Sequence, residues 1–331
     1  MTTIRDVAKH AGVAVSTVSK VINHYPNVSE ETVERVRQAI DELGFVPNSV
    51  AAALSSKQSG RIAILLNPST QTQAIDEITM QYLTGAMLSA QELRTELVPI
   101  LFGSLEGKDE TEAERYLEAQ NIKGLVVCGM SKEDYVLQRL VAREHFKCAL
   151  VDVPIVNDST SYIGLDHKQA QKDIARKTIM ENLGPSKEIL YISGKMNGFV
   201  SEQRLAGMLE LAEELDLSMS VHCGEFSEKK AREITLKYGA GYDIIVCASD
   251  LMAIGAMKAL IEMDIFHPVC GFDGITLMGY VGKQMNTVRQ NFREIGAEAV
   301  RECARLMGGE KGQSVIMDHE LVRLEYLDII V

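Results

Sequence analysis

The first 45 residues repeat their apolar positions every three or four residues, the spacing that is typical of short amphipathic helices. Gly12 interrupts the first apolar stripe and Gly44 follows the last one, and glycine commonly stands just after a helix end. Thr3 precedes the first stripe and Ser29 precedes the third, which are positions suited to helix caps. The pattern predicts three helices over residues 4–11, 15–23 and 30–43.

From residue 61 onward the pattern changes to short apolar runs that alternate with longer helical stretches. Such alternation predicts doubly wound parallel sheets, and about 270 residues favour two such lobes over one. The runs predicted as strands are 61–67, 97–102, 123–128, 148–153, 188–193, 243–248, 269–273 and 320–331. The predicted helices are 74–94, 110–120, 132–144, 168–182, 201–215, 227–237, 250–263 and 292–307.

A break in the pattern separates these two parts. Pro47 and Asn48 end the helical region, and a small, polar stretch follows as far as Gly60. We therefore expect an all-α headpiece, a hinge with a linker, and a two-lobed α/β core. The expected boundaries are 1–46, 47–60 and 61–331, with lobes of about 61–160 plus 291–318 and about 161–290 plus 319–331.

The first two predicted helices have the spacing of a helix-turn-helix. Ala8 allows close helix approach, Gly12 allows a tight turn, and Val18 and Val21 fill the angle between the helices. The outward positions of the second helix contain no acidic residue, and Ser, Thr, Asn and Lys are groups that contact phosphates and bases. A plain three-helix module with a solvated helix face is the alternative interpretation.

These residues resemble the headpiece of the lactose-repressor (LacI-type) family. The resemblance covers TIRDVAKHAGV at 3–13 and TVSKVIN at 17–23, and it continues to Leu54 without a gap. It implies DNA binding by Thr3, Val15, Ser16, Thr17, Ser19, Lys20, Asn23, Asn27, Ser29, Asn48, Ala51 and Leu54. Among these, Val15, Ser16 and Lys20 occupy base-reading positions, and Thr17, Ser19 and Asn23 occupy phosphate-contacting positions.

Two substitutions depart from the family pattern in the second helix. Ala14 stands where the family usually has Ser, and Lys20 stands where Arg is commoner, so a point donor replaces a bidentate fork. The resemblance further implies that residues 48–56 form a hinge helix on DNA, with Leu54 wedged into the minor groove. A flexible linker is the alternative for the hinge.

The core resembles the family's sugar-binding core, which is itself similar to periplasmic sugar-binding proteins. In open α/β sheets ligands lie beyond the carboxyl ends of strands. Polar residues at such ends, together with residues that match the family's ligand segments, give the expected effector residues. These are Asn67, Gln71, Asp152, Arg204, Ser249, Asp273 and Gln290.

Several of these positions have a simpler interpretation or differ from the family. Asn67 also fits a turn before Pro68, and Asp250 fits a helix N-cap better than a ligand group. Ser249 stands where the family usually has Asn, which shortens its reach. His167 stands where Asn is common. The effector's identity is therefore left open.

The net charge of −12 argues against a nucleic-acid partner until it is divided along the chain. Residues 1–61 carry seven Lys or Arg and six Asp or Glu, a net of +1, whereas the rest carries −13. The six cysteines do not form C-x-x-C pairs, and no nucleotide-loop, zinc-protease or nucleophile-elbow motif is present. We expect no cofactor, no metal and no catalysis.

The sequence thus predicts a transcriptional regulator, with repression favoured, that binds a pseudo-palindromic double-stranded DNA operator as a homodimer. A small sugar or sugar derivative between the lobes is expected to control operator affinity. The sequence has neither a signal peptide pattern nor an apolar run long enough to span a membrane, so a cytoplasmic location and no membrane partner are expected. A regulator controlled by a partner protein and a solute-binding protein remain alternatives, and an enzyme is the weakest one.

Overall fold

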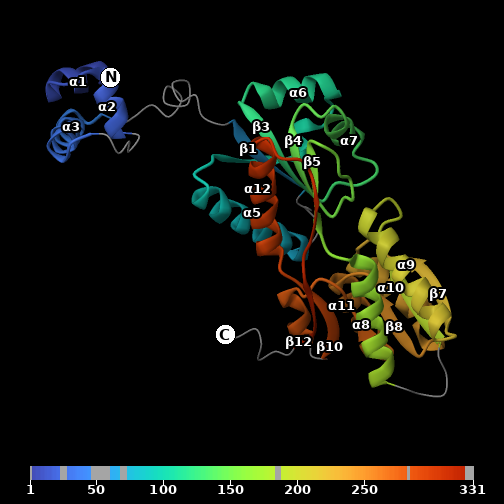
Figure 1. Ribbon diagram of the computed structural model, residues 1–331. Coiled ribbons are helices and arrows are strands. Elements are labelled where there is room, and N and C mark those ends of the chain that lie inside the picture. Colours follow the sequence, from blue (N-terminus) through green and yellow to red (C-terminus); the bar gives the residue numbers. More distant parts are fainter. Residues whose placement is uncertain are drawn as a thin grey trace. The chain divides into compact units, whose positions relative to one another are not determined.

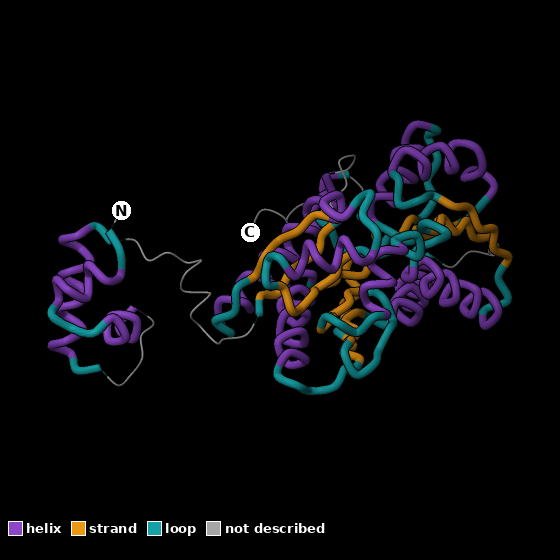
Figure 2. Tube along the Cα trace, turned by 90° about the horizontal axis from the view of Figure 1, so that it is seen from above, coloured by secondary structure: helices purple, strands orange, loops and turns teal. Residues whose placement is uncertain are grey.

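The computed structural model describes residues 2–22, 28–45, 60–67, 73–182, 188–281 and 284–324, with the backbone alone for 73–76. The chain forms two compact units, Met1–Ser59 and Gly60–Val331. Figures 1 and 2 show the helices of the first unit and the two sheets of the second.

The first unit contains three helices whose limits follow local chemistry. They are α1 (Ile4–Ala11), α2 (Val15–Ile22) and α3 (Glu30–Leu43). Thr3 and Asp6 form a capping box at the start of α1, because each accepts a hydrogen bond from the backbone N–H of the other. Gly12 adopts φ 65°, the left-handed conformation that glycine reaches without steric cost, and it turns the chain toward α2.

Small and β-branched side chains form the core between these three helices. Two polar contacts also hold the ends of the unit together: Thr2 Oγ1 donates to the carbonyl oxygen of Leu43 at 3.1 Å, and His10 Nε2 lies 2.7 Å from a carboxylate oxygen of Glu42. The buried residues are Val7, Ala8, Ala11, Val18, Val21, Val36 and Ala39.

The first lobe of the second unit is a parallel six-stranded sheet. Its spatial order is β11-β5-β4-β3-β1-β2. Helices α6 and α7 cover one face of the sheet, and α5 and α12 pack together on the other (Figure 1). The strands are β1 (Arg61–Leu66), β2 (Leu97–Leu101), β3 (Ile122–Cys128), β4 (Lys147–Val151), β5 (Thr160–Gly164) and β11 (Ser314–Ile316); the helices are α5 (Gln73–Glu92), α6 (Glu110–Glu118), α7 (Tyr135–Ala142) and α12 (Phe292–Met307).

The second lobe is also a six-stranded sheet, in the order β12-β10-β9-β8-β6-β7. All its pairings are parallel except that of β10 with β12. Helices α8 and α9 pack together, as do α10 and α11. The elements are α8 (His167–Glu181), β6 (Glu188–Ser193), α9 (Phe199–Glu214), β7 (Ser218–Cys223), α10 (Glu228–Tyr238), β8 (Ile244–Cys247), α11 (Asp250–Glu262), β9 (Val269–Cys270), β10 (Met285–Gln290) and β12 (His319–Leu324).

The chain passes from one lobe to the other three times. The crossings follow β5, β10 and β11, so α12 and β11 complete the first lobe although they come late in the sequence. Strand β5 ends at Gly164, a few residues beyond the lobe boundary of about 160 that the sequence suggested. The two-lobed core and the strand–helix alternation correspond to the predicted fold class.

Four strands were not predicted: β5, β7, β10 and β11. Each lacks a continuous apolar run; β5 reads TSYIG and β7 reads SMSVHC. Pairing with a neighbouring strand stabilises such polar segments, and the local pattern does not report that pairing.

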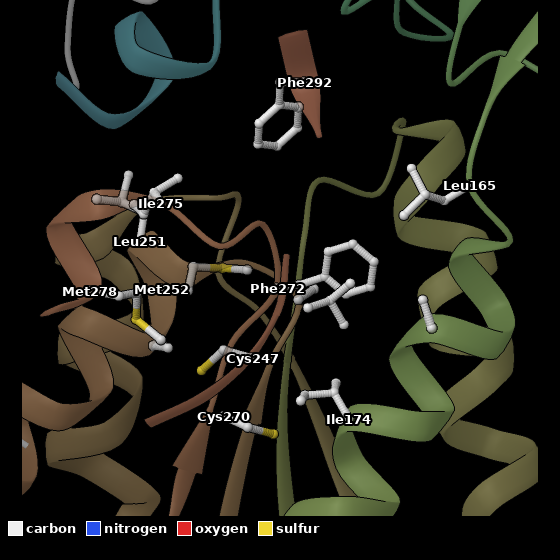
Figure 3. Packing of buried hydrophobic residues seen from close by; sticks show 14 of the residues in the cluster. Leu165, Ile174, Cys247, Leu251, Met252, Cys270, Phe272, Ile275, Met278 and Phe292 are labelled. Carbon is white, nitrogen blue, oxygen red and sulfur yellow. The ribbon is translucent and has the colours of Figure 1, made fainter. Parts of the chain in front are cut away.

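The core of the second lobe is formed by apolar side chains from strands and helices that enclose the sheet. Figure 3 shows Phe272 between the strands that carry Cys247 and Cys270 and the helix that carries Ile174. All six cysteines are free, and burial raises the pKa of Cys148 to about 12. Among the described residues, no helix is both long enough and apolar enough to cross a membrane.

Candidate functional site

Helix α2 presents the surface that the sequence assigned to base reading. Val15, Ser16 and Lys20 are exposed, and the Val15 side chain has 42% of its surface accessible. Val18 and Val21 are buried against the other two helices, so they orient α2. The face is free of acidic residues and combines a methyl-bearing side chain, a hydroxyl and an ammonium group. This combination suits contacts to thymine methyls and base-edge acceptors in a major groove.

The remaining predicted DNA contacts fall into two sets. Thr3 caps α1, and Ser29 precedes α3, where its hydroxyl lies 2.9 Å from Thr32 Oγ1 and makes no hydrogen bond to a helix N–H group. Ser29 therefore occupies the predicted cap position without the predicted side-chain cap. Thr17 and Ser19 are half-buried on α2. The other predicted contacts lie outside the described residues: Asn23, Asn27, Asn48, Ala51 and Leu54.

In the core, a row of polar side chains begins in the first lobe and continues into the second. Asp152 follows β4, and its Oδ1 lies 2.8 Å from Nε2 of His167, the first residue of α8. The other ring nitrogen, Nδ1, accepts from Nε of Arg204 at 3.4 Å. Because Nδ1 accepts, Nε2 must carry the proton that is donated to Asp152. His167 therefore links two predicted effector residues that lie in different lobes.

The row continues from Arg204 along the second sheet. Nη1 of Arg204 donates to the carbonyl oxygen of Ala248 at 2.5 Å and lies 3.7 Å from Oδ1 of Asp273. Nε2 of Gln290, at the end of β10, donates to the same Asp273 oxygen at 3.1 Å. The structure thus brings Asp152, Arg204, Asp273 and Gln290 together, as the sequence predicted.

Burial governs the charges of this row. The pKa of His167 is lowered because its ring is fully buried, so the imidazole is neutral at pH 7. Burial raises the pKa of Asp273 to about 6, against the opposing effect of the Arg204 guanidinium. That guanidinium also lies 3.6 Å from the ring centroid of Phe272, a cation–π contact in a buried setting.

The other three predicted effector residues stand apart from this row. Ser249 is buried and acts as the N-cap of α11, because its hydroxyl accepts from the N–H of Met252 at 3.3 Å. Asn67 is exposed after β1, beside Gly129. Gln71 lies outside the described residues.

The expectation that Asp250 caps α11 is wrong, because Ser249 takes that role. The Asp250 carboxylate instead reaches the loop after β9, where Oδ2 accepts from the N–H groups of Gly274 at 2.7 Å and Ile275 at 2.9 Å. Its Oδ1 accepts from the hydroxyl of Thr287 at 2.5 Å. Asp250 therefore holds the loop that carries Asp273, whose backbone has φ 131°.

His167, Asp250 and Tyr82 are not among the effector residues that the sequence predicted. Tyr82 is buried on α5, and its pKa is raised by burial and by nearby charges that include Asp152 and Asp273. The departure from the usual Asn at position 167 was the available signal. No comparable signal pointed to Tyr82, because its position in a helical stripe is typical of a core residue.

One group of potential metal ligands lies on α6 and in the loop after α7. Glu114, Glu118 and His145 have their ligand atoms within 4.8 Å of one another. His145 Nε2 lies 2.9 Å from Glu118, and Arg143 Nη1 lies 2.6 Å from Glu114. Arg143 thus pairs with Glu114, and these side chains form a cluster of polar contacts near the surface.

Two further contacts join the lobes on either side of the row. Glu77 Oε1 on α5 accepts from the N–H and the hydroxyl of Thr276, at 3.1 and 2.8 Å. Lys132 of the first lobe bonds to Glu202 through Nζ at 2.7 Å and to the carbonyl oxygen of Asn197 through its N–H at 3.0 Å. Segments that follow the carboxyl ends of strands in the two sheets are thus in direct contact in this structure.

Both parts of the chain match known protein families. Residues 3–48 match the family of bacterial regulatory proteins described as the lacI family, and residues 136–311 match a periplasmic binding protein domain. The ribose operon repressor of Halalkalibacterium halodurans is 30% identical over 321 residues, which cover 91% of this chain and 89% of the repressor. The chain belongs to the lacI family.

A second relative and a solved structure match nearly the whole chain. The transcriptional regulator AscG of Escherichia coli K12 is 28% identical over 338 residues, covering 99% of this chain and 98% of AscG. A crystal structure of the Lac repressor dimer bound to operator and the anti-inducer ONPF superposes with a TM-score of 0.80 at 23% identity, covering 98% of this chain and 99% of that one. This lacI-family protein is a DNA-binding transcriptional regulator, and the prediction that it is not an enzyme is confirmed.

Proposed function

We propose that this regulator binds a pseudo-palindromic operator as a homodimer in the cytoplasm and represses transcription there. We also propose that a sugar-like effector at the lobe junction controls its operator affinity. The DNA contacts would come from α2, Thr3 and Ser29, with Asn23, Asn27, Asn48, Ala51 and Leu54 in the segments around the helices. The relatives named as an operon repressor and as a repressor bound to operator support this proposal.

The observation that supports the effector site most directly is the polar row that crosses the lobe junction. Sugar hydroxyls need both acceptors and donors, which carboxylates, an amide and a guanidinium supply. In addition, Oε1 of Gln290 is buried and accepts no hydrogen bond from the described residues. A buried acceptor of this kind is normally satisfied in the functional state, and a ligand hydroxyl would satisfy it. Asn67, Gln71 and Ser249 are proposed to line the margin of the same site.

The position of the row also provides a mechanism. The hydrogen bond between Asp152 and His167 joins the first lobe to the second. A ligand whose hydroxyls replace this hydrogen bond therefore changes the contacts between the lobes. An effector shifts a conformational equilibrium only through such a difference in contacts between the two states. We propose that the lobes respond as rigid bodies and that the hinge of residues 47–60 transmits the change to the headpiece of residues 1–46.

A sugar panel tests this proposal in the full-length protein. Sugars at millimolar concentration are expected to raise the melting temperature and to change the affinity for selected operator DNA in a mobility-shift titration. Gln290→Met should abolish both effects, since it keeps the volume and removes the amide. Gln169→Met, at an exposed position in the same lobe, is the control. If no sugar changes either quantity, the effector class is refuted and control by a partner protein is favoured.

A further inference from the structure

The loop that follows β6 leads into the longest helix of the second lobe through two glycines. It comprises Gly194–Gly198, and Gly198 is the N-cap residue of α9 with extended backbone angles, φ −87° and ψ 131°. A glycine has no side chain with which to cap a helix. No acceptor is found within the described residues for the N–H groups of Phe199, Val200 and Ser201. The first turn of this sixteen-residue helix therefore retains its donors and its partial positive charge.

The side chain of Ser201 supplies a second, independent observation. Only 6% of the residue is exposed, and its Oγ has no hydrogen-bond partner among the described residues. The same Oγ lies 2.5 Å from where a Cβ on Gly194 would be and 2.9 Å from where a Cβ on Gly198 would be. The hydroxyl thus lies beside both glycines. The Phe226 ring fills the side of Gly194, where its Cζ lies 2.1 Å from where a Cβ would be, whereas the side of Gly198 is where a capping group would normally lie. Leaving a buried hydroxyl unpaired costs about 1–3 kcal/mol, which a bound acceptor would recover.

The charges around the loop favour an anion. Lys195 is exposed within the loop, and the backbone N–H of Lys132 in the first lobe donates to the carbonyl oxygen of Asn197 in the loop. Glu202 is the acidic residue of the first turn of α9, and its charge is matched by the Lys132 ammonium. A strand, a glycine loop and a helix N-terminus in this order form an arrangement that binds phosphate groups through backbone N–H donors.

The same helix carries part of the effector site. Ser201 and Arg204 lie on the buried face of α9, three residues apart, and residues at this spacing are neighbours on a helix. The contact between Lys132 and Asn197 places the loop at the lobe junction. An effector that contacts Arg204 and Asp273 with its hydroxyls can therefore extend an acidic substituent toward the start of α9.

We propose that the N-terminus of α9 binds the phosphate group of the effector, and that the effector is a phosphorylated sugar. This inference rests on the proposed function for the sugar portion. The N–H groups of the first turn and the Ser201 hydroxyl donate to the phosphate oxygens. Lys195 provides charge attraction.

The variant Gly198→Asp tests the proposal by supplying a covalent anion at the cap position. The backbone angles of Gly198 suit any residue. The contact below 3.0 Å is with the end of the Ser201 side chain, and the Lys195 carbonyl oxygen at 3.3 Å requires a shift of only a few tenths of an ångström, so the variant is expected to fold. Ser201→Ala is a second, milder variant. Gly241→Asp is the matched control, because it adds the same charge at an exposed position of this lobe where a Cβ meets nothing within 4 Å.

The measurements are calorimetric titrations of the full chain with inorganic phosphate, glucose, ribose and the monophosphate esters of both sugars, at constant ionic strength. The wild type and Gly241→Asp are expected to bind at least one ester about tenfold or more tightly than its parent sugar. In Gly198→Asp this preference should disappear, and in Ser201→Ala it should fall by about threefold or more.

The outcomes separate this inference from the proposed function. Equal affinity for sugars and their esters, or a preference that survives in Gly198→Asp, overturns the phosphate site and leaves a neutral sugar effector. Binding of inorganic phosphate that depends on Ser201, with no binding of any sugar or ester, supports the anion site and refutes the proposed sugar effector. No binding of phosphate or of any ester overturns the inference.

Discussion

At the scale of single residues, the core contains two buried carboxylates, Asp250 and Asp273. Asp250 accepts hydrogen bonds from the loop that carries Asp273. Burial raises the pKa of Asp250 to about 8, with a further upward contribution from the Asp273 charge, and burial raises the pKa of Asp273 to about 6. In the unfolded chain both groups titrate near pH ~4. The folded protein therefore binds more protons than the unfolded chain between pH ~4 and ~8. This contribution to the unfolding free energy is fully present below pH ~4 and declines as the pH rises.

Asp273→Asn should consequently change how stability depends on pH. The variant loses one buried charge and relieves the neighbouring Asp250, so its unfolding free energy relative to the wild type should rise progressively from pH 5 to pH 8. Urea unfolding at several pH values measures this difference. A difference that stays constant or falls over the same range would contradict the assignment. The same variant should bind effector more weakly, which separates the group's role in binding from its effect on stability.

The contacts of these residues also show where the sequence was informative. That Asp152, Arg204, Asp273 and Gln290 lie near one another could be predicted, because strand ends and family motifs place them at the carboxyl edges of the sheets; their effector role stays a prediction. His167 could not, because its role depends on a hydrogen bond to Asp152 in the other lobe. Asp250 was misassigned because a cap and a loop anchor look alike when only the neighbouring residues are known.

At the scale of elements, the helices were predicted more accurately than the strands. Helix α3 has the predicted bounds, and α1 begins after the predicted cap residue, Thr3. Helix signals are local, since caps and apolar stripes lie within a few residues of each other. Strand β5 was missed because its hydroxyl-rich segment becomes a strand only between β4 and β11.

Helix α2 allows a prediction about DNA affinity. Lys20→Ala should weaken binding to a selected operator by about 1–3 kcal/mol, since it removes a donor to a base edge. Mobility-shift titrations on DNA selected with the wild-type protein give the affinity. Lys237→Ala, an exposed lysine of α10 in the core unit, is the control and should leave it unchanged. Equal affinity in both variants would remove Lys20 from the recognition surface.

At the scale of the whole molecule, the second unit exposes apolar side chains on one helix of its first lobe. Met80, Met87 and Leu88 on α5 are all exposed, and Met80 and Met87 each have more than half of their surface accessible, at 57% and 56%. Exposed apolar groups clustered on one helix are typical of an interface. We propose that this helix contributes to the homodimer, in which two recognition helices meet two half-sites.

Met87→Glu should therefore separate the subunits. A charge in an apolar interface is costly, so sedimentation is expected to show a monomer whose melting curve remains cooperative, and operator binding should fall sharply. Tyr135→Glu places the same charge at an exposed apolar position on α7, which covers the opposite face of the sheet. A Met87→Glu protein that stays dimeric would exclude α5 from the interface.

The three crossings between the lobes also determine the order in which the nascent chain can fold. The headpiece helices end at Leu43, so the ribosome releases them early and they can pack while the core is still being made. The first lobe begins at β1 but is incomplete until α12 and β11 have been synthesised, as far as Ile316. The second lobe is incomplete until β12 has been synthesised, as far as Leu324. Both lobes therefore become complete within a few residues of each other, late in synthesis. Ribosome profiling of chaperone contacts should show protection of the core until nearly the whole chain has emerged.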